Sequence, residues 1–137
     1  MEINKKIKEM NNIFSVFDDP MDKYTQIIEL GKKNKGLDTI DKNDINRIYG
    51  CTSLAWVKTL KKNNLYSIQI DADTLIVKGL LNILQYIIDE SSKEDILKIE
   101  INNILKNIGL EKSITSQRTN GFLSAMEKIK KQISNYG

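Results

Sequence analysis

The sequence contains no histidine and only one cysteine, Cys51, among its 137 residues. Without an imidazole or a second thiol, the chain cannot form a Ser-His-Asp or Cys-His catalytic arrangement. Nor can it supply a Cys/His cluster for structural zinc or a self-contained iron–sulfur centre. The phosphate-binding motifs GxxxxGK[ST] and GxGxxG are also absent. We therefore expect no metal and no cofactor on this chain.

Long apolar runs and strong charge are also missing. The start, MEINKKIKEM, lacks an apolar run of signal-peptide length, and residues 75–88 fall short of the roughly 18 to 20 residues that a membrane span needs. The net charge is only +3, with lysines scattered along the chain, so we expect no nucleic-acid binding. A single cysteine cannot form an internal disulfide, which favours a reducing, cytoplasmic location.

The periodicity of apolar residues predicts helices around a small sheet. Residues 3–17 have the pattern of an amphipathic helix, and Asp19-Pro20 has the features of a helix start. That second helix is expected to end near Gly31. Further helices are predicted over residues 74–89, in broken form from 92 to a stop at Gly109, and from about 116 to 136.

Two short runs rich in β-formers, residues 54–60 and 65–70, predict a hairpin joined by residues 61–64. They follow a polar loop of about fifteen residues, 32–46, and ordered loops of that length are uncommon unless they are functional. The class is α+β: a small antiparallel sheet flanked by helices, in one domain spanning residues 1–137.

Three residues break local rules within the predicted helices. Gly79 and Gly121 each cost about 1 kcal/mol against alanine inside a helix. Arg118 lies near a helix N-terminus, where the backbone dipole disfavours a cation. Taken one at a time, each has an ordinary explanation: the glycines permit close packing, and an exposed arginine costs little. Together with a lone cysteine beside a long loop, they indicate where to look for a functional site.

Cys51 itself has two interpretations. Free cysteine is among the most buried residue types and is usually inert. As the only thiol, it is also the obvious nucleophile, and it would act without an imidazole base. Thiol exchange requires only the thiolate, whose population a nearby cation would raise. We expect Arg118 to be that cation, on a last helix whose N-terminus packs near the cysteine loop.

Four motifs, in order, resemble those of the SufE family. They are Tyr24 with Ile27-Ile28-Glu29-Leu30-Gly31, Gly50-Cys51-Thr52-Ser53 with Trp56, Asp71 and Asp73 with Lys78-Gly79-Leu80, and Arg118-Thr119-Asn120-Gly121. Ala55 and Phe122 depart from the family's usual Val and Leu, which are similar in character. The resemblance covers nearly the whole chain and implies the SufE/IscU-like fold.

The resemblance implies a sulfur acceptor for a pyridoxal-phosphate-dependent cysteine desulfurase, either SufS-like or CsdA-like. Cys51 would take sulfur by transpersulfuration, hold it as a persulfide, stimulate the desulfurase, and pass sulfur to a SufBCD-like iron–sulfur scaffold. The chain would then be an accessory protein rather than an enzyme, as a monomer or weak homodimer. Two alternatives remain: a non-covalent module that regulates a desulfurase, and an iron–sulfur scaffold.

The same resemblance assigns roles around Cys51. The cysteine would lie at a loop tip, directed toward a partly apolar cavity, and would move when the desulfurase docks. Trp56 is expected to pack beneath the loop. The supporting residues would be Arg118, Ser53 and Gly50, and the docking face would include Asp71, Asp73 and Thr74.

Overall fold

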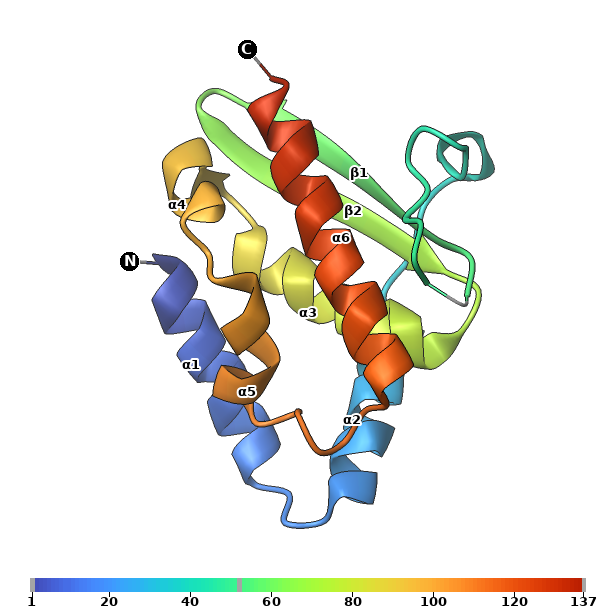
Figure 1. Ribbon diagram of the computed structural model, residues 1–137, viewed down its shortest axis with the longest axis vertical. Helices are drawn as coiled ribbons and strands as arrows, with labels where there is room; N and C mark the ends of the chain where they lie inside the picture. Colours follow the sequence, from blue (N-terminus) through green and yellow to red (C-terminus); the bar gives the residue numbers. More distant parts are fainter. Residues whose placement is uncertain (1, 52, 137) are drawn as a thin grey trace.

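The computed structural model describes residues 2–51 and 53–136 and has the predicted α+β architecture (Figure 1). Met1, Gly137 and the Thr52 of the cysteine motif lie outside the described residues. The elements are α1 (Glu2–Ser15), α2 (Pro20–Lys33), the 3₁₀ helix η1 (Thr39–Asp41), β1 (Ala55–Lys62), β2 (Leu65–Ala72), α3 (Leu75–Ile88), β3 (Ser91–Ser92), α4 (Lys93–Leu97), the 3₁₀ helix η2 (Ile101–Asn103), α5 (Ile104–Ile108) and α6 (Ser116–Ser134).

The sheet is antiparallel, with strand order β1-β2-β3. β1 and β2 pair from Ala55 opposite Ala72 to Lys62 opposite Leu65, so the hairpin predicted from the sequence is confirmed. Both strands run further than expected, and a two-residue turn replaces the predicted connection over residues 61–64. Asn63 adopts φ 58°, a left-handed conformation that asparagine tolerates better than most residues.

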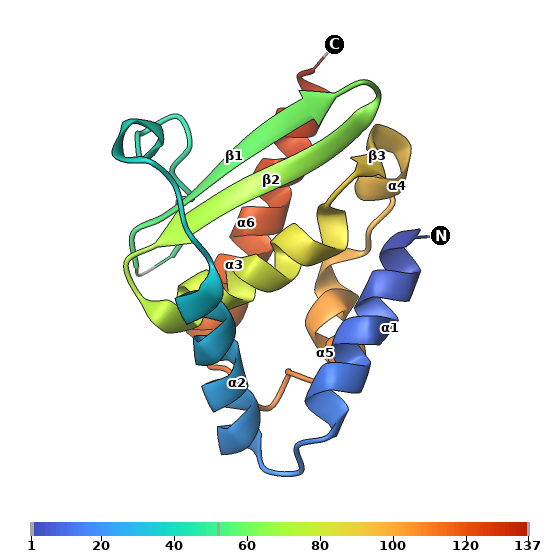
Figure 2. The same ribbon diagram turned by 180° about the vertical axis from the view of Figure 1, so that it is seen from behind.

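One face of the sheet is buried by helices. Alternate side chains of the hairpin are buried, and Val57, Ile68 and Ile70 among them are at most 2% exposed. α3 and α6 pack across this face, and α1, α2 and α5 lie on the far side of α3 (Figures 1 and 2). As predicted, α3 is mostly buried, because it lies between the sheet and the other helices.

α2 and α3 approach so closely that neither helix could carry a side chain at the contact. A Cβ on Gly79 would lie 1.9 Å from the carbonyl oxygen of Ile27, and one on Gly31 would lie 2.3 Å from that of Leu75. Gly79 therefore has the packing role that its cost inside a helix suggested. α2 ends at Lys33, close to the end predicted near Gly31, and Gly31 itself is a contact point in the last turn of the helix.

Most other predicted helix boundaries are confirmed by their caps. The Asp19 side chain accepts from Met21 N at 2.9 Å, and Ser92 Oγ accepts from Asp95 N at 3.2 Å. Gly109 closes α5 at φ 89°. The last helix ends at Ser134, short of the predicted residue 136. Within the described ranges, no helix has both the length and the apolar character needed to cross a bilayer.

A long connection, residues 34–54, joins α2 to β1 and projects beside the edge of the hairpin (Figures 1 and 2). It is longer than the loop predicted over residues 32–46: it begins two residues later, because α2 extends to Lys33, but it continues to the start of β1 at Ala55. The connection contains η1, and its Arg47 forms an isolated antiparallel bridge with Trp56 of β1. Its final part carries Cys51 back over the helices.

Candidate functional site

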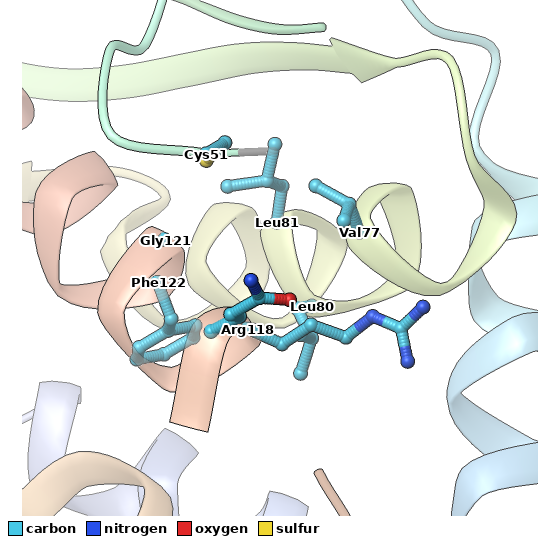
Figure 3. A pocket seen from close by; sticks show the side chains of 8 residues that line it. Cys51, Val77, Leu80, Leu81, Arg118, Gly121 and Phe122 are labelled. Carbon is cyan, nitrogen blue, oxygen red and sulfur yellow. The ribbon is translucent and has the colours of Figure 1, made fainter. Parts of the chain in front are cut away.

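Cys51 lies at a small cavity between α3 and α6 (Figure 3). The walls come almost entirely from these two helices: Val77, Leu80 and Leu81 from α3, and Gln117, Arg118, Gly121 and Phe122 from α6. Leu80, Leu81 and Phe122 belong to the core and are each 2% exposed, so the back of the cavity is rigid and apolar. The Cys51 side chain is half-buried against it.

Gly121 makes room for the thiol. A Cβ at this position would lie only 2.9 Å from Cys51 Sγ, closer than carbon and sulfur can pack. The glycine is buried in the second turn of α6, as the sequence predicted. Its cost to the helix is therefore explained by a sulfur atom that occupies the space of the missing side chain.

Gly50 allows the backbone conformation that places Cys51 beside α6. It adopts φ 97°, a conformation that L side chains rarely take. A Cβ on Gly50 would also lie 2.6 Å from Ser124 Oγ of α6. The residue before the cysteine thus combines a required backbone geometry with close contact to the helix that forms the cavity.

Burial in this apolar setting raises the pKa of the Cys51 thiol above its ordinary value. The thiolate would lose hydration there without gaining a compensating charge. In the observed position, Cys51 is therefore held as the neutral thiol, the less reactive form.

Arg118 lines the same cavity, but its guanidinium is directed away from Cys51 (Figure 3). Its Nη1 donates a hydrogen bond to the Tyr24 hydroxyl at 3.1 Å, and the group lies 5.7 Å from the centre of the Tyr24 ring. The structure thus brings Arg118 to the cysteine loop, as expected, with its charge directed toward α2. The predicted effect on the thiolate requires a rotation of this side chain and stays a prediction.

The turn from β2 into α3 lies beside the cysteine loop. The hydroxyls of Ser53 and Thr74 share a hydrogen bond at 3.2 Å, and Asp73 N donates to the Leu54 carbonyl at 3.0 Å. The Asp73 side chain is exposed. Ser53 therefore holds the loop to the start of α3, and this contact joins two of the predicted site segments.

Asp71 has a different environment from its two neighbours in the predicted docking face. It is 5% exposed and accepts from the amides of Leu37 at 3.0 Å and Ala72 at 2.8 Å. Two lysines pair with it, Lys42 at 3.0 Å and Lys78 at 3.6 Å. A partner could not reach this carboxylate in the observed conformation. Its contacts instead tie the long connection to β2 and α3.

The charge of Asp71 is stabilised by these contacts. Burial alone would raise the pKa of the carboxyl, but the hydrogen bonds from Leu37, Lys42 and Ala72 and the charge of Lys78 more than offset it. The net result is a pKa below the ordinary value. Asp71 is therefore ionised at neutral pH and serves as an anchor.

Sequence reasoning did not identify several residues at the site. Val77 and Leu81 have the pattern of ordinary core residues on an apolar helix, and nothing local distinguishes those that border a cavity. Tyr24 was noted as part of a motif, without its pairing to a residue 94 positions away. Trp56, expected as a packing residue, is half-buried in β1 with Lys42 Nζ 5.7 Å from its ring centre.

The described residues include no group of three or more His, Cys, Asp or Glu side chains placed to hold a metal ion. This result gives no support to the scaffold alternative from the part of the chain that the structure covers. The chemistry available at the cavity is that of one thiol in an apolar surrounding.

Comparison with known proteins agrees with the motifs. The sequence profile of SufE, described as an Fe-S metabolism associated domain, matches residues 8–133. An uncharacterized SufE-like protein of Rhizobium meliloti (strain 1021) is 30% identical over 123 residues, covering 87% of this chain and 88% of that protein. A second, from Rhizobium etli, is 31% identical over 123 residues, covering 87% and 83% of the two chains.

The fold also has a counterpart among solved structures. The solution structure of a hypothetical protein from Thermus thermophilus superposes with a TM-score of 0.77 at 17% identity, covering 94% of this chain and 93% of the other. At that identity the likeness speaks for the fold alone. Together with the profile match over most of the chain, these findings show that the protein belongs to the SufE family of Fe–S metabolism associated domains.

Proposed function

We propose that this protein is the sulfur acceptor and carrier for a pyridoxal-phosphate-dependent cysteine desulfurase in iron–sulfur cluster assembly, with Cys51 as the accepting residue. The observation that carries the proposal is the position of Cys51 Sγ at an apolar cavity, in the space left by Gly121. A SufS-like or CsdA-like enzyme would supply the sulfur, and a SufBCD-like scaffold complex would receive it. A reducing cytoplasm would keep the lone thiol free for this task.

The transfer is a thiol exchange without net oxidation. The Cys51 thiolate attacks the terminal sulfur of the persulfide on the desulfurase, a new S–S bond forms on Cys51, and the bond to the desulfurase sulfur breaks. The desulfurase cysteine leaves as a thiolate, and the transferred sulfur keeps its proton. The proton of the Cys51 thiol is lost to solvent before attack.

The raised pKa of Cys51 suits a carrier that is protected until it meets its partner. In the cavity the thiol is neutral and a poor nucleophile. Movement of the loop into solvent would remove the burial that raises the pKa and would restore the thiolate population of an ordinary cysteine. After the transfer, return to the cavity would shield the persulfide from reduction by small thiols.

A docking surface for the desulfurase borders the same loop. Leu54 is 41% exposed and Leu75 is 42% exposed, on either side of the Ser53–Thr74 hydrogen bond. Exposed apolar side chains beside a reactive group are typical of a partner-binding surface. Asp73 and Thr74, in the same turn, would complete it, whereas Asp71 would act indirectly by anchoring the neighbouring connection.

The test is sulfur loading by a desulfurase. The protein is incubated with free cysteine and a desulfurase from the same cell, and its intact mass should rise by one sulfur atom, mapped to Cys51 by peptide analysis. Leu75→Asp should raise the protein concentration needed for half-maximal loading, while Leu97→Asp, exposed on α4, serves as the matched control. Failure to load with every desulfurase of that cell would exclude the carrier role.

The same assay separates the carrier from a purely regulatory module. Cys51→Ser cannot accept sulfur, so a carrier should lose its stimulation of the desulfurase with this substitution. If Cys51→Ser stimulated as well as the unsubstituted protein, the non-covalent alternative would be the correct one.

A further inference from the structure

The cavity at Cys51 is very small. Its volume is about 10 Å³. That is about the smallest volume that accommodates a single water molecule. The surrounding side chains are mainly apolar and offer few of the polar partners that hold a water in place. A polarisable, weakly hydrated atom such as sulfur suits the space better.

The length of an S–S bond decides how much of a sulfur chain can enter. A sulfur added to Cys51 lies about 2.05 Å from Sγ, within a cavity of this size. A second sulfur would extend about the same distance again. It would then have to displace Leu80, Leu81 or Phe122, which are core residues at 2% exposure, or leave the cavity.

The walls have little freedom to yield. Leu80 and Leu81 lie on α3, which is fixed between the sheet and α2, and the α2 contact at Gly79 has no space for even one methyl group. On the other side, a Cβ added at Gly121 would lie 2.9 Å from Sγ, so α6 has no room there for even one methyl group. A close-packed interior of this kind resists the insertion of extra atoms.

We propose that this cavity limits Cys51 to one transferred sulfur, so that the protein carries a persulfide and excludes longer polysulfides. The limit is set from α3 by the lining side chains, of which Val77 and Leu81 are the two that we test, and from α6 by the close approach of Gly121. The inference rests on the proposed function for its biological meaning, but its chemistry does not depend on a desulfurase.

Extension of the Cys51 persulfide to a longer polysulfide is a competing reaction. The persulfide on Cys51, once deprotonated, can attack the terminal sulfur of another persulfide, which adds one sulfur to Cys51 and releases the donor as a thiolate. Inorganic polysulfide extends a thiol by the same exchange and leaves a polysulfide one atom shorter. A cavity that retracts the first persulfide would prevent the second step.

The experiment loads the folded protein with excess sodium polysulfide and counts the added sulfurs by intact mass. We expect one sulfur on the folded protein and a distribution of one, two and more on the same protein in urea, where the cavity is absent. Leu81→Ala and the milder Val77→Ala enlarge the cavity and should carry two or more when folded. Leu105→Ala, a buried leucine of α5 outside the cavity lining, is the matched control and should carry one.

The outcomes separate the two proposals. A folded protein with the same distribution as the urea-unfolded protein, or one that takes no sulfur, would overturn the one-sulfur limit. So would Leu81→Ala and Val77→Ala variants that both fold and still carry one. A protein that takes one sulfur from polysulfide and none from any desulfurase would keep the limit and reject the carrier function.

Discussion

The charge of Arg118 and the thiol of Cys51 share one cavity without acting on each other in the observed conformation. The hydrogen bond and ring contact with Tyr24 hold the guanidinium on the α2 side. Arg118 meanwhile lines the cavity. Tyr24 therefore determines whether the cation is available to Cys51, and the pairing is a testable point of control.

Replacing Tyr24 should make the thiol more reactive. Tyr24→Leu removes both contacts, which frees Arg118 to turn toward Cys51, and a nearby cation lowers a thiol pKa. Because each unit of pKa changes the thiolate fraction about tenfold, we expect the iodoacetamide alkylation rate near neutral pH to rise by about twofold to tenfold. The measurement is the rate as a function of pH, which gives the pKa directly.

Two controls define the result. Tyr86→Leu, near the C-terminal end of α3 and away from the cavity-lining residues of that helix, should leave the alkylation rate unchanged. The double variant Tyr24→Leu/Arg118→Ala should lose the gain, since no cation remains to turn. A Tyr24→Leu protein with an unchanged thiol pKa would show that Arg118 does not act on Cys51.

At the scale of elements, the sequence predicted what local chemistry determines. The start of α2 at Asp19-Pro20, the cap at Ser92 and the stop at Gly109 were all correct because each depends on side chains within a few residues. β3 was missed, since two polar residues, Ser91-Ser92, carry no strand pattern and pair only because β2 lies beside them.

The site shows the same division. Cys51, Gly121 and Arg118 were identified from their local anomalies and motifs, and the structure brings all three to one cavity. Its walls on α3 could not be predicted, because a leucine beside a cavity and a leucine in the core have the same periodicity. Nor could the burial of Asp71, whose partners come from a connection more than 25 residues earlier in the chain and from α3.

The contact between α2 and α3 gives a prediction on stability. Gly79→Ala should destabilise the protein, although alanine is the better helix former by about 1 kcal/mol. Its Cβ would meet the Ile27 carbonyl at 1.9 Å, and a backbone atom cannot move without shifting α2. Forced expansion of a packed contact costs about 1–3 kcal/mol, and a contact this short with a backbone atom belongs at the upper end of that range. After the gain of about 1 kcal/mol in helix propensity, the net loss in the free energy of unfolding should be about 2 kcal/mol.

Urea denaturation measures this loss. Lys8→Ala, an exposed position on α1, controls for the general effect of alanine and should change stability by less than about 0.5 kcal/mol. A Gly79→Ala protein as stable as the parent would mean that α2 and α3 can separate slightly without cost. The rigid wall assigned to α3 at the Cys51 cavity would then be in doubt as well.

At the scale of the whole molecule, Asp71 joins β2, where it lies, to the start of α3 through Lys78 and to the sequence-distant connection after α2. Gly36 permits this junction, since a Cβ there would lie 2.4 Å from the Asp71 carboxylate. The connection ends in the cysteine loop, and α3 forms the wall of the cavity. The carboxylate therefore fixes two elements that form the site, although Asp71 does not line the cavity.

This anchor predicts a pH dependence of stability. A carboxyl whose pKa is lower in the folded than in the unfolded state stabilises the fold above its unfolded value, near 3.9. That contribution disappears as the pH falls through the lower folded value. Asp71→Asn should thus cost about 1–3 kcal/mol at pH 7, because the Leu37 amide and two lysines lose their ionised partner.

The difference in the free energy of unfolding between Asp71→Asn and the parent protein should decrease as the pH falls below about 4. Protonation then removes the same charge from the parent. Urea unfolding at pH 7 and near pH 3 tests this, with Asp73→Asn as the matched control, because the exposed Asp73 lies two residues away. An equal difference in the free energy of unfolding at both pH values would mean that the amide hydrogen bonds, rather than the charge, hold the connection.

If instead the difference disappears at low pH, Asp71→Asn should also raise the alkylation rate of Cys51 at pH 7. The reason is that a loosened connection would let the cysteine loop move out of the cavity.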